Sequence, residues 1–98
     1  MLYIIAEDFI HPDKIQAVLP LYHELVELTQ QEQGCLSYEL THDLKDEGHF
    51  LFLEKWETEV DLDHHISSEH FQRLVPEINT YTRLESRFTR MLSFKEME

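Results

Sequence analysis

The sequence has few of the residues that cross-link a chain or interrupt its helices and strands: one cysteine, two glycines and three prolines among 98 residues. A single cysteine, Cys35, excludes an internal disulfide framework. The scarcity of Gly and Pro, together with an ordinary 42% of hydrophobic residues, argues against disorder. We therefore expect a single folded domain over residues 1–98, with a loose tail over 95–98.

Basic residues are also few. Eight Lys and Arg stand against 20 Asp and Glu, which gives a net charge of −12. Nucleic acids and anionic membranes both attract basic surfaces, so neither is an expected partner. The first ten residues carry Glu7 and Asp8 instead of the basic lead of a signal peptide. No apolar run approaches the roughly 20 residues of a membrane helix. We predict a soluble, cytoplasmic protein.

The hydrophobic pattern changes period several times along the chain. Alternating or continuous β-formers predict strands, and apolar residues at helical spacing predict helices. Thr58 and Ser67 or Ser68 are candidate N-caps, and Pro20 is expected to kink the long helix. The predicted elements are strands over 2–10, 35–43, 49–57 and 83–94, a helix over 12–32, and shorter helices over 58–66 and from 67 or 68 to about 80.

This order, β-α-β-β-α-β, predicts an α+β fold of the ferredoxin-like type. Its four-stranded antiparallel sheet would carry the helices on one face. Leu51 and Leu53, and with them Met91, are predicted to lie on the other face, which two helices cannot cover. A homodimer that packs sheet against sheet would bury these side chains.

The stretch from Phe50 to Phe71 brings aromatic, carboxylate and imidazole groups to the junction of a buried strand and a helix. Phe52 and Trp56 share one strand face and would suit either a flat aromatic ligand or core packing. Glu54 lies between them and must be paired or solvated, so it could orient His65 or pair with an arginine such as Arg87 or Arg90. The other predicted pocket residues are Tyr22, Tyr38 and Phe50.

Three motifs resemble the antibiotic biosynthesis monooxygenase family of small dimeric α/β-barrel proteins. They are EQGCLSYE at 32–39, Glu54-x-Trp56, and Leu62-x-x-His65 followed by Ser68-x-His70-Phe71. The resemblance implies a ferredoxin-like fold that forms a dimeric barrel, with His65 facing the cavity between helices and sheet. The family's haem-degrading members carry a functional Asn in the first strand, and LYIIAEDFI has none.

The family resemblance implies a cofactor-independent oxygenase that acts on a small quinol or polyphenol. His65 would accept the proton, because imidazole exchanges protons near neutral pH. A histidine that only fixes the helix by a hydrogen bond is the alternative reading. The alternative functions are an isomerase acting on a small, phosphorylated dione and a non-catalytic ligand-binding dimer. An isomerase of that kind would need basic residues at the pocket mouth, with Arg73, Arg83, Arg87 and Arg90 as candidates.

The seven histidines do not predict a metal site. His64 and His65 point apart on a helix, and His65 and His70 share no face unless the break at Ser67 realigns them. No HxxxH or Cys-His pattern is present. Glycine-rich nucleotide loops are also missing, since only Gly34 and Gly48 are available. We expect neither a metal nor another cofactor.

Overall fold

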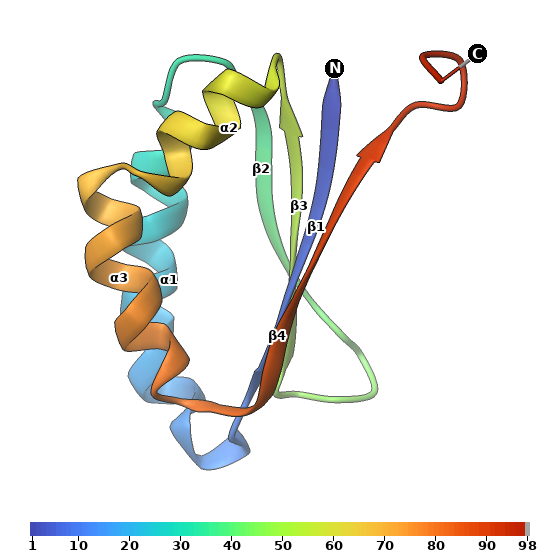
Figure 1. Cartoon of the computed structure of the whole chain (residues 1–98). Coiled ribbons are helices and arrows are strands. Elements are labelled where there is room, and N and C mark those ends of the chain that lie inside the picture. Colours follow the sequence, from blue (N-terminus) through green and yellow to red (C-terminus); the bar gives the residue numbers. More distant parts are fainter. Residues whose placement is uncertain (98) are drawn as a thin grey trace.

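The computed structural model describes residues 1–97, and its sheet has the strand order β2-β3-β1-β4 with every neighbouring pair antiparallel. All helices lie on one side of the sheet (Figure 1). The ferredoxin-like α+β fold is confirmed. The elements are β1 (Leu2–Ile10), a 3-10 turn (Pro12–Lys14), α1 (Ile15–Gln30), β2 (Cys35–His42), β3 (His49–Trp56), α2 (Glu59–Ile66), α3 (Glu69–Asn79) and β4 (Thr82–Leu92).

Local chemistry explains where the two short helices begin. Thr58 Oγ1 accepts a hydrogen bond from the Asp61 amide at 3.1 Å, and Ser68 Oγ accepts one from the Phe71 amide at 3.3 Å. These are the N-caps that the sequence predicted. The break between them is two residues long, so α2 and α3 are separate helices with different axes (Figure 1). His65 lies in the last turn of α2, and His70 lies in the first turn of α3.

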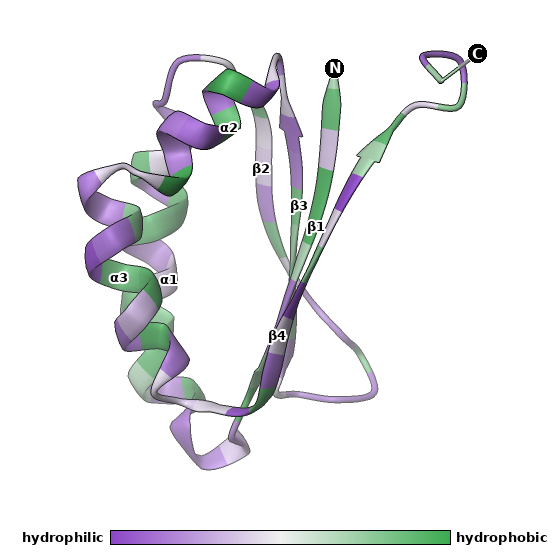
Figure 2. Cartoon of the chain, viewed as in Figure 1, coloured by the Kyte–Doolittle hydropathy of each residue, from purple (hydrophilic) through white to green (hydrophobic). Residues whose placement is uncertain are grey.

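The core lies between the helices and the inner face of the sheet. Along α1 and α3, hydrophobic and hydrophilic residues alternate, as expected for helices with one buried side (Figure 2). The sheet contributes the alternate residues of its two central strands, because successive side chains of a strand point to opposite faces. The largest fully buried side chains include Ile4, Val18, Tyr22, Trp56, Leu62, Leu74 and Ile78.

No helix within residues 1–97 covers the outer face of the sheet (Figure 1). Ile5 and Leu53 are directly opposite each other in the β1–β3 register, and Leu53 is 40% exposed. On β4, Leu84 and Phe88 have the same parity, but a register shift pairs Leu84 with Phe9 and Phe88 with Ala6. Leu84 therefore lies on the opposite face from Phe88 and adds to the apolar outer surface.

The N-terminal amine contacts the turn that follows β4. Ser93 and Glu96 close a turn, and Glu96 Oε2 accepts from the N-terminal amine at 2.8 Å. Glu98, part of the tail predicted to be loose, lies outside the described residues. Among residues 1–97, no helix has the length and apolar character needed to cross a bilayer.

Gly34 fixes the turn between α1 and β2. Its φ is +81°, a conformation that L side chains rarely adopt, and its carbonyl accepts from the Glu57 amide at 2.9 Å. A Cβ added here would lie 2.1 Å from the carboxyl carbon of Asp61. The turn therefore seats the residues just before it, including Glu32, against α2.

We expect Gly34→Ala to lower the free energy of unfolding by roughly 1–3 kcal/mol, because of backbone strain and the clash with Asp61. Urea denaturation measures this loss. Gln33→Ala, at the exposed neighbouring position, is the control and should change stability by less than about 0.5 kcal/mol. Equal stabilities of the two variants would contradict this account of the turn.

Candidate functional site

A cavity of about 160 Å³ lies between the inner face of the sheet and the helices. Its walls are mainly apolar, and a few polar groups converge on it, which is the usual composition of a small-molecule site. The apolar lining comprises Ala6, Leu25, Phe52, Phe71, Val75, Ile78 and Phe88. The polar lining comprises Asp8, Tyr38, Glu54, His65, Asn79, Ser86 and Arg87.

His65 lines this cavity and is only 2% exposed. Its Nδ1 atom is 2.6 Å from Glu32 Oε2. Because a carboxylate only accepts, Nδ1 carries the proton and Nε2 is left with a lone pair. Burial lowers the pKa of His65, against the opposing pull of Glu32, so the neutral ring is favoured. A neutral, oriented imidazole is suited to accept a proton.

Glu32 is a site residue that the sequence analysis did not single out. It follows α1 in the turn closed by Gly34, and its Oε2 atom also lies 2.9 Å from His70 Nε2. One carboxylate oxygen therefore binds two imidazoles from two different helices. The break at Ser67 realigns the two rings, which was the condition for His65 and His70 to come together. The position of Glu32 within the motif at 32–39 was the only sequence signal.

Glu54 lines the same cavity, but it has neither of the two roles predicted from the sequence, which were to orient His65 and to pair with an arginine. Its Oε1 atom accepts from Trp56 Nε1 at 2.9 Å. It does not orient His65, since Glu32 holds the Nδ1 atom, and no ion pair joins it to Arg87 or Arg90 within residues 1–97. Burial raises the pKa of Glu54 to about 7. Both of its protonation states are therefore available near neutrality.

The other predicted pocket residues divide into two groups. Phe52 and Tyr38 line the cavity. Trp56 is fully buried with its ring centroid 4.9 Å from that of His65, so it supports His65 from outside the lining. Tyr22 and Phe50 also lie outside the lining of this cavity, and the Tyr22 hydroxyl donates to Asp8 Oδ2 at 2.7 Å.

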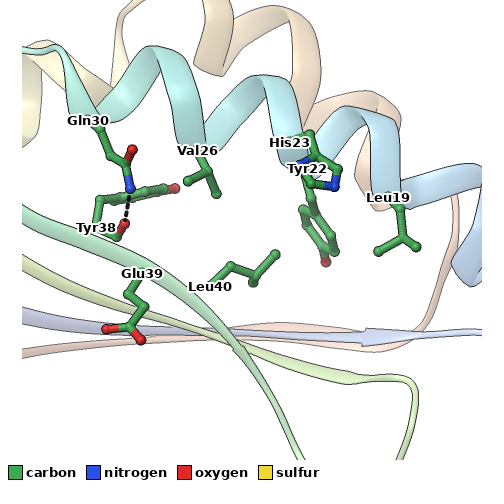
Figure 3. A pocket seen from close by; sticks show the side chains of 8 residues that line it. All are labelled: Leu19, Tyr22, His23, Val26, Gln30, Tyr38, Glu39 and Leu40. Carbon is green, nitrogen blue, oxygen red and sulfur yellow. Dashed lines mark hydrogen bonds between the residues drawn. The ribbon is translucent and has the colours of Figure 1, made fainter.

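A second hollow, of about 340 Å³, runs along the edge of the sheet between α1 and β2 (Figure 3). Gln30 spans it by donating from Nε2 to the backbone oxygen of Tyr38 at 3.0 Å (Figure 3). Tyr22 and Tyr38 also line this hollow, and its imidazole and carboxylate, those of His23 and Glu39, are exposed to solvent. It therefore lacks the buried, oriented proton acceptor that His65 provides in the inner cavity.

The four arginines of the last third do not form one cluster. Arg73 pairs with Glu24 and Glu69, and Arg83 pairs with Asp46. Of the four, Arg87 alone lines the inner cavity within the described part of the chain. The cavity thus offers one guanidinium instead of the several that a phosphate group would favour.

Comparison with known proteins identifies the family. The family model described as "Antibiotic biosynthesis monooxygenase" matches residues 1–77. The chain belongs to the antibiotic biosynthesis monooxygenase family. A crystal structure titled an antibiotic biosynthesis monooxygenase is 52% identical, with a TM-score of 0.93 and coverage of 95% of this chain and 98% of that one.

More distant relatives also match this chain. "Putative monooxygenase YcnE" of Bacillus subtilis is 32% identical over 66 residues, or 67% of this chain and 70% of YcnE. The Synechocystis protein sll1783 matches at 32% identity over 67% of this chain, and the match spans 45% of that protein. A conserved protein of Methanosarcina mazei is 29% identical, with a TM-score of 0.89 and coverage of 92% of this chain and 89% of that one.

The raised pKa of Glu54 predicts a pH-dependent contribution to stability. The carboxyl takes up its proton more readily in the folded chain, so its contribution is full below about pH 4.5 and is lost as the pH rises through about 7. Glu54→Gln keeps an acceptor for Trp56 and cannot ionise. The free energy of unfolding of this variant, relative to that of the wild type, should therefore rise by about 3 kcal/mol between pH 5 and pH 9.

Urea unfolding of both proteins at pH 5 and pH 9 measures this difference. Glu57→Gln, which changes an exposed carboxylate just beyond β3, is the control and should give the same small effect at both values. A pH-independent effect of Glu54→Gln would show that Glu54 ionises normally in the folded chain.

Proposed function

We propose that this protein is a cofactor-independent monooxygenase that oxidises a small quinol with dioxygen, with His65 as the proton acceptor. The support is one observation. The Nδ1 atom of His65 is held by Glu32 at 2.6 Å, which leaves the lone pair on Nε2, and the residue lines a cavity with mainly apolar walls. The names of the family and of YcnE agree with oxygenase chemistry.

The proposed reaction begins with proton transfer. Nε2 of His65 takes the proton of a quinol hydroxyl, and the resulting anion is electron-rich enough to reduce dioxygen. Oxygen then adds to a ring carbon, and loss of water leaves a hydroxyquinone. The quinol gives up four electrons, two on becoming a quinone and two on gaining the hydroxyl group. One oxygen atom ends in the product and the other in water, so atoms and electrons balance.

The cavity suits a substrate with a single ring. A cavity of about 150 Å³ holds a benzene molecule in another protein, and this one measures about 160 Å³. Phe52 and Phe71 would pack against the ring. Asp8 and Glu54 offer carboxyl groups to hydroxyls of the substrate. Exclusion of water strengthens each of these interactions.

His65→Gln should lower kcat for oxygen uptake by about 10²–10⁴-fold, because the glutamine amide can still bond to Glu32 but cannot accept a proton. Glu32→Gln should reduce kcat less and leave KM nearly unchanged, since it acts by orienting His65. An oxygen electrode with a panel of single-ring hydroquinones measures both effects. With ¹⁸O₂, the product should carry one labelled atom.

His64→Gln is the matched control, because it removes an exposed imidazole one residue away on the same helix. Its rate should equal that of the wild type. No oxygen consumption by the wild type with any hydroquinone would refute the oxygenase proposal and favour a non-catalytic binding protein. Full activity of His65→Gln would remove His65 from the reaction.

An isomerase is the second candidate, favoured by the presence of two proton-handling groups in one cavity. His65 could take a proton next to a carbonyl, and Glu54, with a pKa of about 7, could return one. Arg87 could bind an anionic group of such a substrate. Turnover of a small dione under nitrogen, with exchange of its carbon-bound hydrogen for deuterium, would favour this function.

We further propose that the protein acts as a cytoplasmic homodimer. The support for a dimer is the uncovered outer face of the sheet, on which Ile5, Leu53 and Leu84 lie without a helix to cover them. Packing this face against its copy would remove the apolar surface from water.

Leu53→Glu should convert the dimer into a monomer, because it places a charge in the middle of the proposed interface. Light scattering after size-exclusion chromatography measures the mass. Val60→Glu is the control: it makes the same kind of change at a residue that is 60% exposed on α2, and it should leave the dimer intact. A monomeric wild type, or a dimeric Leu53→Glu variant, would refute this interface.

A further inference from the structure

Three side chains that can bind a metal, one carboxylate and two imidazoles, converge where α2, α3 and the turn after α1 meet. Glu32 Oε2 lies 2.6 Å from His65 Nδ1 and 2.9 Å from His70 Nε2. One ligand atom from each residue falls within 4.8 Å of the other two. Each residue comes from a different segment: the turn after α1, the end of α2 and the start of α3. The tertiary fold alone creates this group.

The donor set matches the preference of borderline transition metals. Two imidazoles and a carboxylate hold zinc in many proteins, with water as the fourth ligand. Metal–ligand bonds of about 2.0–2.2 Å place tetrahedral donors roughly 3.4 Å apart. The present spacings of 2.6 and 2.9 Å would therefore need to widen by less than about 1 Å. Side-chain rotations of Glu32 and His70 can supply this widening.

The group is also accessible. The side chains of Glu32 and His70 are 15% and 14% exposed, whereas that of His65 is 2% exposed. An ion can thus arrive from solvent past Glu32 and His70 without crossing the inner cavity, and a water molecule can complete its coordination. The net charge of −12 favours the approach of cations.

We infer that Glu32, His65 and His70 form a binding site for a divalent transition metal of the zinc class. The metal takes the place of the two hydrogen bonds and coordinates His65 through Nδ1. A neutral imidazole with a metal on Nδ1 carries its proton on Nε2. Since the lone pair of Nε2 is the proton acceptor of the proposed function, metal binding removes that acceptor. The ion is therefore an inhibitor, and this consequence rests on the proposed function whereas the binding site itself does not.

Zinc binding to the full chain tests the site directly. Titration with Zn²⁺ against a chromophoric chelator should give one ion per chain with a dissociation constant in the micromolar range or tighter. Zn²⁺ should also raise the melting temperature, because it binds the folded state. His70→Gln and Glu32→Gln should each weaken binding by about tenfold or more, as removal of a ligand costs at least as much as removal of its supporting partner.

His64→Gln is the control for binding, since it removes an exposed histidine beside the site and should bind Zn²⁺ as the wild type does. If the wild type takes up no zinc, or if His70→Gln binds it equally well, the site is refuted and the contacts serve only to join three segments. Circular dichroism recognises variants that do not fold. If the variants do not fold, the rise in the melting temperature of the wild type on addition of Zn²⁺ decides whether the site binds zinc.

The activity arm separates this inference from the proposed function. Zn²⁺ should inhibit oxygen uptake by the wild type and should inhibit the His70→Gln variant only at concentrations about tenfold higher or more. Zinc binding without any oxygen uptake would leave the site established and refute the proposed reaction. Oxygen uptake that persists when zinc occupies the site would refute the inhibition.

Discussion

The short hydrogen bond between Glu32 and His65 is the contact on which the site depends. A buried imidazole is costly unless its polar atoms are satisfied, and Glu32 satisfies one of them while leaving the lone pair on the other. The same carboxylate oxygen binds His70, so a single acidic residue connects α2, α3 and the turn after α1. The carboxylate of Glu32 therefore both orients the proton acceptor, His65, and attaches the two short helices to the rest of the fold.

The pKa values of two ionisable groups in the cavity are shifted in directions that suit proton transfer. Burial lowers the pKa of His65 and raises that of Glu54 to about 7, since in each case it disfavours the charged form. The ring of Trp56 connects them, because its Nε1 atom donates to Glu54 and its face packs on His65. Trp56 thus acts from behind the cavity wall, by holding the carboxyl group and the imidazole in place.

The shared use of His65 makes the proposed metal site and the proposed oxidation mutually exclusive. Nδ1 must carry a proton for Nε2 to act as a base, and it must lose that proton to bind a metal. The cluster opens to solvent through Glu32 and His70, whereas His65 lines the cavity. Such an arrangement allows one ring to respond to two different ligands on its two sides.

Local sequence patterns are enough to predict the strand and helix order, the caps at Thr58 and Ser68, and the alternation that buries Phe52, Glu54 and Trp56 on one face. Those features follow from local periodicity and capping, which involve neighbours a few residues apart. The pairing of Glu32 with His65, 33 residues further along the chain, follows from the tertiary packing. The same packing places Tyr22 and Phe50 outside the lining of the inner cavity. Contacts between residues far apart in the sequence depend on how the helices pack on the sheet. A single sequence carries no local signal for that packing.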